Sequence, residues 1–414
     1  MFLLIAFLYI VFYLGPFYYS TRVLKLKLIN PITIVLLINM PIDIFKLFVG
    51  PFFLLDGSGS KGLYFAYMMS IINMVIQLLL IIFYLKLKVI RCFATKLCIG
   101  KKNILETNFE KLKYLFLFLA IFFFLILAVR SGTFLKWFID PRDAYINNRV
   151  GNGLFYGLSI NFLSLSTFFA FFQKISIKKL FFRFIFYSML LYPYGSKGLY
   201  INLFIFFLIA VWRIDSKMNL KVMLPTSVII VLLVLFNFNS NLSSISFEQV
   251  SAYFDYFFNA AVYYDDFFLG NHDLNYGKIY LSSFWEYVPR GIYPDKPYIY
   301  GILNIVEYYY PGGPESGNTP AFGGQVLEFA DFGVLGVIFN SIFSFGLIFK
   351  AVFLLTVFRF GVFNKDKFSL IELLVLIYLF APSFGIYAPS FFFIILVFIV
   401  GNIINLQRRL KFYN

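Results

Sequence analysis

The chain has 414 residues, of which 61% are hydrophobic and only 13% are charged, and its formal net charge is +15. This composition excludes a water-soluble globular protein, because soluble domains carry about twice that share of charged residues. It also excludes a nucleic-acid partner, since the basic residues lie in short segments between apolar runs and cannot form a soluble basic face.

Long apolar runs follow one another along the chain. They are about 17 to 25 residues long, the length that a helix needs to cross a bilayer. A helix pairs its own backbone N–H and C=O groups, as lipid requires. The sequence therefore predicts an all-α polytopic integral membrane protein with about 11 transmembrane helices. In chain order, the expected spans are residues 2–19, 29–54, 62–85, 114–130, 153–173, 180–194, 198–212, 222–237, 326–349, 368–382 and 388–406.

Between the eighth and ninth spans the chain leaves the apolar pattern over residues 238–325, which are predicted to form one large extracytoplasmic loop. No internal repeat or low-complexity linker is evident, so residues 1–414 are expected to form a single integral membrane domain. The first apolar run has no basic start and no clear cleavage site, and it is expected to be a retained span.

The distribution of charge predicts the orientation of the chain. Most of the 35 Lys and Arg residues fall in the loops after the first, third, fifth, seventh, ninth and eleventh spans. Basic residues accumulate on the cytoplasmic side of membrane proteins. The amino terminus and the large loop are therefore expected on the extracytoplasmic side of the membrane, and the carboxyl terminus in the cytoplasm.

Residues that bind metals are scarce. Cys92 and Cys98 are the two cysteines, and they lie in a loop predicted on the reducing side, so they indicate neither a disulfide nor a metal pair. His272 is the single histidine and is expected to be a solvated loop residue. No metal and no cofactor is predicted.

The predicted large loop is rich in tyrosines and acidic residues. Aromatic rings offer flat apolar faces, and carboxylates accept hydrogen bonds from hydroxyl groups, so this combination suits a carbohydrate. An aromatic belt at the membrane surface is the alternative explanation for the tyrosines. Prolines flank two cations of the loop, Arg290 and Lys296, and are expected to fix their positions.

Cations are few in the other outer loops. Arg142 and Arg149 lie between the fourth and fifth spans, and Lys197 lies in a short hairpin between the sixth and seventh. Such cations are candidates to bind a phosphate or pyrophosphate at the membrane surface. Contact with lipid headgroups is the alternative, and it is favoured for Arg130 and Lys136.

The entry into the ninth span carries helix-capping residues. Thr319 is expected to be the N-cap, and Pro320 the first helical residue.

Four segments resemble the O-antigen polymerase (Wzy) family of oligosaccharide repeat-unit polymerases. FWEYVPRGIYPDKP (residues 284–297) and NTPAFGGQVLEFADFGVLGVIFNSIFSFGL (318–347) resemble the family's Pro-Arg and Lys-Pro loop and the Gly-rich entry into a late span. GSKGLYINLFIF (195–206) is similar to the start of another span, with Lys197 where the family more often has Arg. DPRDAYINNRVGNG (140–153) is a looser match to an Arg-containing outer loop.

The resemblance implies a metal-independent glycosyltransferase of the bacterial plasma membrane. It would transfer a growing glycan from undecaprenyl diphosphate to another lipid-linked repeat unit, and so build O-antigen, capsule or exopolysaccharide. The implied partners are the undecaprenyl-diphosphate-linked oligosaccharide, membrane lipids and a polysaccharide chain-length regulator.

The resemblance also suggests roles for residues. Arg290 and Lys296 are expected to stabilise the departing diphosphate. Glu286 is a candidate general base, with a salt bridge to Arg290 as the alternative. Other carboxylates that are candidates for the base are Asp265, Asp266 and Asp295, and a reaction that uses no carboxylate as base is the remaining alternative. Further expected substrate contacts are Arg142, Arg149, Lys197, Trp285, Tyr287 and Tyr293.

Two other functions are compatible with the same sequence. An O-antigen ligase would use the same donor but deliver the glycan to the lipid A core. A flippase or transporter is less well supported, because such proteins usually have short outer loops and repeated halves.

Overall fold

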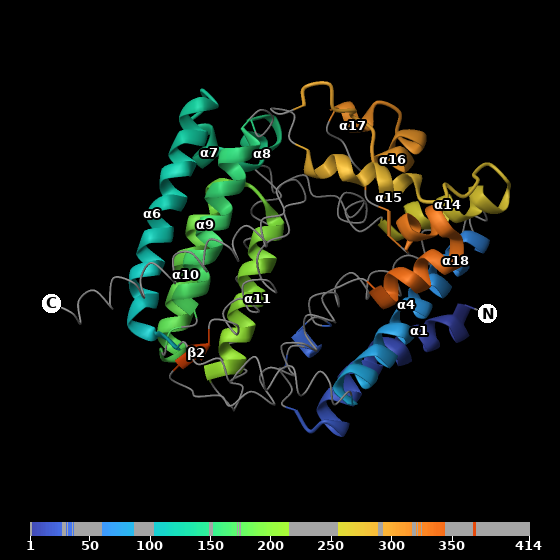
Figure 1. Ribbon diagram of the computed structural model, residues 1–414, viewed down its shortest axis with the longest axis horizontal. Coiled ribbons are helices and arrows are strands. Elements are labelled where there is room, and N and C mark those ends of the chain that lie inside the picture. Colours follow the sequence, from blue (N-terminus) through green and yellow to red (C-terminus); the bar gives the residue numbers. More distant parts are fainter. Residues whose placement is uncertain are drawn as a thin grey trace, which may run out of the picture. The chain divides into compact units, whose positions relative to one another are not determined.

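The computed structural model is mostly helical in its described part, with one short pair of strands (Figure 1). The described residues are 2–26, 30, 32–34, 36, 60–86, 103–148, 152–171, 173, 175–214, 256–288, 293–316, 320, 322–323, 325–343 and 367–369. The chain divides into two compact units. The first comprises Met1–Leu26, Val35–Leu87 and Ile245–Val352, and the second comprises Lys27–Ile34, Lys88–Ser244 and Phe353–Asn414.

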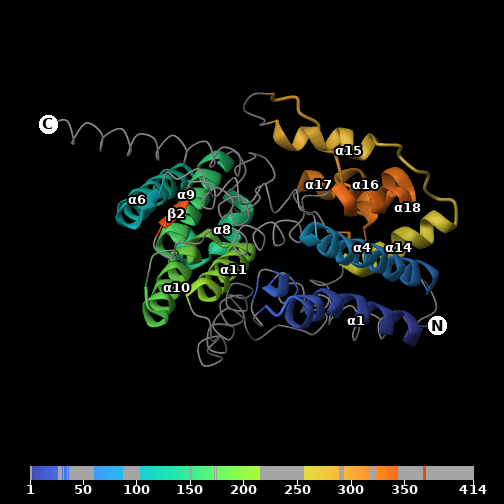
Figure 2. The ribbon, with the colours of Figure 1, turned by 60° about the horizontal axis from the view of Figure 1, so that its bottom comes forward.

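The first unit joins amino-terminal helices to the region predicted as the large loop. Helix α4 packs against α1, α14 and α18 (Figures 1 and 2). The elements are α1 (Phe2–Tyr18), a π-helical turn (Tyr19–Val23), α4 (Ser60–Lys86), α14 (Tyr256–Phe268), α15 (Lys278–Ser282), a 3₁₀ turn (Ser283–Tyr287), α16 (Leu303–Tyr309), α17 (Gly313–Ser316) and α18 (Val326–Phe343).

Aromatic rings hold α4, α14 and α18 together. The ring of Phe65 in α4 lies 4.9 Å from Tyr264 in α14 and 5.3 Å from Phe329 in α18, and both pairs are edge-to-face. Tyr264 and Phe329 contact each other at 5.0 Å. Such pairs contribute about 0.5–1.5 kcal/mol beyond the apolar area that they bury. The abundance of Phe and Tyr in the sequence thus serves packing in this unit.

The second unit is built around α9. Fourteen residues of α9 are buried, including Ser159, Ser166 and Phe162. The ring of Phe162 stacks on Phe116 of α6, and the hydroxyls of Ser159 and Ser166 donate to backbone carbonyls of α6 at 2.7 and 2.9 Å. The elements are β1 (Asn103–Leu105), α6 (Glu106–Arg130), α7 (Lys136–Ile139), α8 (Pro141–Asn148), α9 (Gly153–Phe171), α10 (Ile177–Leu191), a 3₁₀ turn (Tyr192–Tyr194), α11 (Lys197–Ile214) and β2 (Lys367–Ser369), which pairs antiparallel with β1.

Four helices are long and apolar enough to cross a membrane: Leu4–Val23, Lys61–Phe83, Phe109–Arg130 and Gly153–Phe171. They coincide with the first, third, fourth and fifth predicted spans, so a multi-pass membrane protein is confirmed in this part of the chain. Helices α10 and α11 coincide with the sixth and seventh. The expected spans at 29–54, 222–237, 368–382 and 388–406 lie wholly or mostly outside the described residues.

The ninth predicted span, 326–349, begins at Val326 as expected, but α18 is not a continuous helix. Pro320 lies outside any helix, and α18 begins at Val326, so the prediction of Pro320 as the first helical residue is wrong. Thr319 lies outside the described residues. The helical geometry breaks at Phe332 and Gly333, where Gly333 has φ 63°. A glycine adopts this conformation without the penalty that a side chain would bring.

Asp331, at the break in α18, holds the start of α15. The Asp331 side chain is fully buried. Its two carboxylate oxygens accept hydrogen bonds from the backbone N–H groups of Ile279 at 3.0 Å and Tyr280 at 2.7 Å. These groups have no partner within the helix, because they belong to its first turn. A carboxylate from a distant helix thus fixes the segment that leads into residues 284–297.

We expect Asp331→Ala to loosen this segment. Two buried N–H groups would lose their acceptors, at a cost of about 1–3 kcal/mol each. Trypsin should then cleave faster after Lys278, which is exposed, while cleavage after Lys136 in the other unit stays at the wild-type rate. Asp331→Asn keeps one acceptor and should give an intermediate rate. Equal cleavage after Lys278 in all three proteins would contradict the capping role.

Candidate active site

The segment 283–300 begins and ends at positions that lie close together. The backbone N–H of Gly301 donates to Ser282 Oγ at 2.9 Å, and the Asn304 side chain donates to the Gly301 carbonyl at 2.8 Å. Gly301 has φ 55°, and a Cβ there would lie 2.6 Å from Ser283 Oγ. The motif predicted to carry function is therefore a loop whose two ends are hydrogen-bonded together, and we call it the motif loop.

Two predicted substrate contacts meet across the motif loop. The rings of Trp285 and Tyr293 lie 5.3 Å apart, although eight positions separate them in the sequence. Tyr293 is 45% exposed, so one aromatic surface of the loop is open to a ligand. The pair flanks the stretch that contains Arg290. Arg290 itself lies outside the described residues, and for Glu286 and Tyr287 the structure describes only the backbone, in the 3₁₀ turn.

Lys296 is a buried residue of the motif loop. Its side chain is only 5% exposed, and Nζ lies 4.4 Å from the centre of the Tyr300 ring. A buried ammonium is stabilised by such a ring face. The backbone N–H of Lys296 also donates to the Tyr293 carbonyl in a turn. Lys296 is thus a positioned cation, as the flanking prolines suggested.

A second group of polar and aromatic side chains lies between α14 and α16. Tyr309 OH donates to Asp266 Oδ2 at 2.8 Å and lies 2.9 Å from His272 Nε2. The His272 ring stacks on Tyr263 at 5.2 Å and meets the Tyr308 ring edge-on at 4.2 Å. We call Asp266, Tyr309 and His272 the histidine triad. The expectation that His272 is simply solvated is wrong, because it is half-buried and hydrogen-bonded.

Burial shifts the pKa values of the histidine triad. It lowers the pKa of His272 from its usual value, more than the nearby Asp266 raises it. The pKa of Tyr309 is raised, by burial first and then by its hydrogen bond to Asp266. Burial thus favours the neutral form of the His272 imidazole and of the Tyr309 hydroxyl.

Asp265 and Asp266 are neighbours in α14 with different surroundings. Asp265 Oδ1 accepts from the backbone N–H of Gly62 at 2.7 Å, in the first turn of α4. An acidic group at this end of a helix is favourable because the helix dipole is positive there. Asp265 therefore holds two helices together, whereas Asp266 belongs to the histidine triad. The sequence alone predicted both as candidate bases and could not distinguish their roles.

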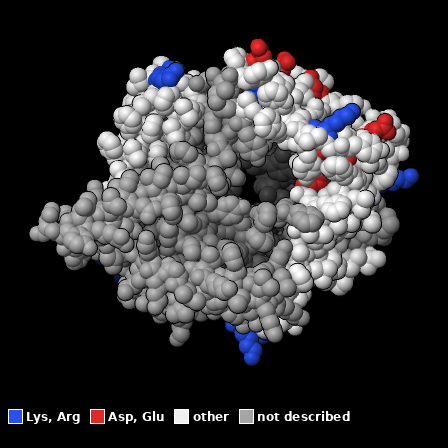
Figure 3. Space-filling view, viewed as in Figure 1, with Lys and Arg blue, Asp and Glu red and all other residues white. Residues whose placement is uncertain are grey.

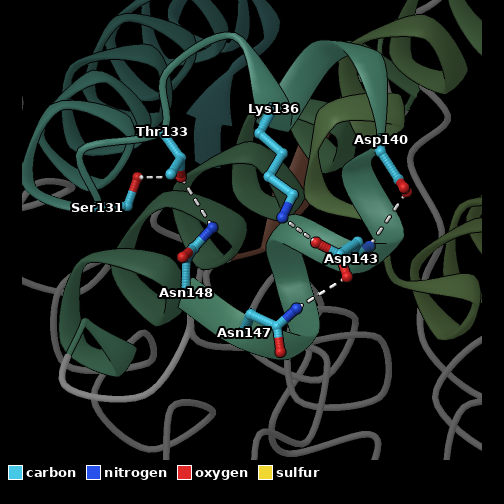
Figure 4. A network of polar contacts seen from close by, with 7 residues as sticks. All are labelled: Ser131, Thr133, Lys136, Asp140, Asp143, Asn147 and Asn148. Atoms are coloured by element: carbon cyan, nitrogen blue, oxygen red, sulfur yellow. Dashed lines mark hydrogen bonds and ion pairs between the residues drawn. The ribbon is translucent and has the colours of Figure 1, made fainter.

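In the second unit, the segment between α6 and α9 is fixed by polar contacts (Figure 4). Lys136 forms an ion pair with Asp143, and Asn147 donates to the same carboxylate at 2.8 Å. Hydrogen bonds from Lys136 and then Asn147 lower the pKa of Asp143. Asn148 donates to Thr133 Oγ1 at 2.8 Å. Lys136, which was expected to contact lipid headgroups, also has a protein partner.

Arg142 lies beside the hairpin that carries Lys197. Its guanidinium is 3.5 Å from the Gly195 carbonyl and 5.3 Å from the Tyr145 ring centre. A Cβ on Gly195 would lie 2.1 Å from the Pro141 carbonyl, so the hairpin and α8 are in close contact. Two predicted phosphate contacts are thus carried by adjoining segments. The Lys197 side chain and Arg149 are outside the described part of the structure.

The exposed face of the first unit combines charge with aromatic surface. Acidic side chains gather over the part that holds α14 to α17 (Figure 3). Among the exposed aromatic residues there are Tyr276, Tyr298 and Tyr308. Carboxylates and aromatic faces are the groups that bind a glycan. Within the described residues, no group of three or more His, Cys, Asp or Glu side chains is arranged to hold a metal ion.

Comparison with known proteins gives two curated relatives. The chain is 29% identical over 225 residues to an O-antigen polymerase of Salmonella typhimurium and, with the same values, to one of Salmonella typhi. The match covers 53% of this chain, and the chain spans about half the length of the relatives it matches. No protein-family model and no solved structure matches. The two relatives support membership of the O-antigen polymerase family and confirm the resemblance seen in the motifs.

Proposed function

We propose that this chain is a membrane glycosyltransferase that joins lipid-linked oligosaccharide repeat units into O-antigen. The observation that carries the proposal is the 29% identity over 225 residues to two O-antigen polymerases. The four apolar helices support it, since a lipid-linked substrate must be met at a membrane. We place the protein in the bacterial inner membrane, with the large loop and the amino terminus outside and the carboxyl terminus in the cytoplasm.

The substrate that we propose is an oligosaccharide on undecaprenyl diphosphate. The acceptor hydroxyl of one repeat unit attacks the anomeric carbon of the glycan on the other carrier. The bond from that carbon to the diphosphate oxygen breaks, and the diphosphate leaves with the electron pair. Preorganised cations stabilise charge that develops in this way. No metal is needed in this scheme, and a chain-length regulator is the proposed partner.

Arg290 and Lys296 are the proposed cations at the leaving diphosphate. Lys296 supports this role because it is a buried cation of the motif loop, with Nζ 4.4 Å from the centre of the Tyr300 ring. Arg binds phosphate through two parallel hydrogen bonds, which suits Arg290 at the same loop. Arg142, Arg149 and Lys197, in the other unit, are proposed as phosphate contacts from the sequence. Glu286 is likewise a candidate general base from the sequence alone.

The proposed reaction is tested by complementation of a strain in which the gene is deleted. We expect the deletion strain to carry a single repeat unit on its surface glycan, and the wild-type gene to restore a long ladder on a gel. Long lipid-linked polymer left unattached in the deletion strain would identify a ligase. Single units that accumulate on the cytoplasmic face would identify a flippase.

A further inference from the structure

The histidine triad brings together residues from separate parts of the predicted large loop. Asp266 lies in α14, His272 follows that helix, and Tyr309 ends α16, 37 positions beyond His272. The proposed role of Arg290 and Lys296 makes no use of these three side chains. Chains that join a carboxylate to an imidazole through hydrogen bonds control the orientation and basicity of the imidazole.

The hydrogen bonds of the triad define the tautomer of His272. Tyr309 has one hydroxyl hydrogen, and it donates that hydrogen to Asp266. The Tyr309 oxygen can then only accept from His272, so His272 Nε2 carries the hydrogen of this contact. Neutral imidazole has one N–H, and Nδ1 therefore holds the lone pair. Within the described residues, Nδ1 has no hydrogen-bond partner.

Three tyrosine rings pack against the imidazole, and the ring of Tyr308 is exposed. Tyr263 is fully buried and stacks on one side of His272, which fixes the plane of the ring. Tyr308 lies 4.2 Å from His272 and is 55% exposed. A sugar ring packed on the exposed face of Tyr308 would bring its hydroxyl groups beside the imidazole. Aromatic faces are well suited to such packing, because they combine apolar area with rigid geometry.

We propose that His272, in place of Glu286, is the general base that takes the proton of the acceptor hydroxyl, and that Asp266 and Tyr309 are positioning residues that orient it. The proposal rests on the proposed glycosyl transfer. The acceptor O–H bond breaks, its proton goes to His272 Nδ1, and its oxygen bonds to the anomeric carbon of the donor. The imidazolium then passes the proton to solvent. Its charge is stabilised through Tyr309 by Asp266.

The histidine triad makes the reaction sensitive to acid. The groups that face His272 are Asp266 and Tyr263 from α14, and Tyr308 and Tyr309 from α16. Burial lowers the pKa of His272 below its usual value. The imidazole is then the available base above that pKa and is lost as the pH falls through it. The rate of transfer should therefore fall on the acid side of its pH profile, and we call this fall the acidic limb.

The test measures the rate of glycan transfer by the full-length protein in proteoliposomes between pH 5 and 8. The substrate is the lipid-linked repeat unit extracted from the deletion strain. We expect His272→Gln to lower the rate at pH 7.5 about 100-fold or more and to remove the acidic limb, since an amide cannot take the proton. Gln retains a polar side chain next to Tyr309, and monodisperse elution in detergent checks its folding.

Tyr309→Phe and Asp266→Asn test the positioning roles. Tyr309→Phe keeps the ring that packs on Phe322 but removes the link to Asp266. Both variants make the imidazolium less stable, so the acidic limb should move to lower pH while the rate falls about 10-fold. A residue with a structural role alone would lower the rate without moving the limb. If His272→Gln does not fold, the pH profiles of these two variants test whether His272 is the base.

Different results would overturn the role of His272 and the proposed polymerisation. A wild-type rate and an unchanged acidic limb in His272→Gln overturn the role of His272 and leave polymerisation by the wild type in place. An unmoved limb in both Tyr309→Phe and Asp266→Asn overturns the role of the triad. Absence of polymer from the wild-type protein overturns the proposed function, and the assignment of His272 with it.

Discussion

Replacing Arg290 with alanine is expected to reduce the surface glycan from a ladder to a single repeat unit, at an unchanged protein level. The proposed reaction releases a diphosphate, and removal of one preorganised donor to such developing charge typically slows a reaction by about 100-fold to 1000-fold. The motif loop supports this role, because its ends are joined at Ser282 and Gly301 and it contains a second cation, the buried Lys296.

Two further variants make this experiment specific. Arg290→Lys keeps the charge but loses the paired hydrogen bonds, so a short ladder is expected. Lys278→Ala removes an exposed cation from α15, just before the motif loop, and should leave the ladder intact. A full ladder with Arg290→Ala would show that this side chain does not stabilise the leaving diphosphate. Loss of the ladder with Lys278→Ala would point to a general charge effect.

Gly62→Ala is expected to prevent the first unit from folding stably. A Cβ at this position would lie 2.0 Å from the Ala261 carbonyl oxygen and 2.8 Å from Asp265 Cγ. Both neighbours belong to α14 and one is backbone, so the helices must separate. The hydrogen bond from Gly62 to Asp265 would be lost as well. Overpacking and an unpaired buried group together cost about 3 kcal/mol or more.

Gly198→Ala is the matched control for this substitution. Gly198 lies in α11, and a Cβ there would meet nothing within 4 Å. Alanine is better than glycine in a helix by about 1 kcal/mol, so stability should stay the same or rise slightly. The measurement is the melting temperature and the monodisperse yield in detergent. Equal values for Gly62→Ala and the wild type would contradict the close contact of α4 with α14.

Much of the helical structure could be predicted from the sequence, because an apolar run long enough to cross a bilayer is a local property. Helices α1, α4, α6 and α9 coincide with predicted spans for this reason. The turn between α10 and α11 was predictable as well, since Pro193 and Gly195 are turn residues and Gly195 has φ 60°. The break in α18 was not, because the apolar pattern runs on through Gly333.

The sequence by itself determined that the chain lies in a membrane, and its motifs resemble one family and predict that the residues around Arg290 carry the function. Composition and short motifs are sufficient for this, because each depends on neighbours in the chain. Only the tertiary structure showed the hydrogen-bond partners of Asp265, Asp266 and His272. Asp265 binds Gly62 across 203 positions, and His272 meets Tyr309 across 37. A side chain's chemistry depends on such partners, and contacts between distant segments form only when helices pack.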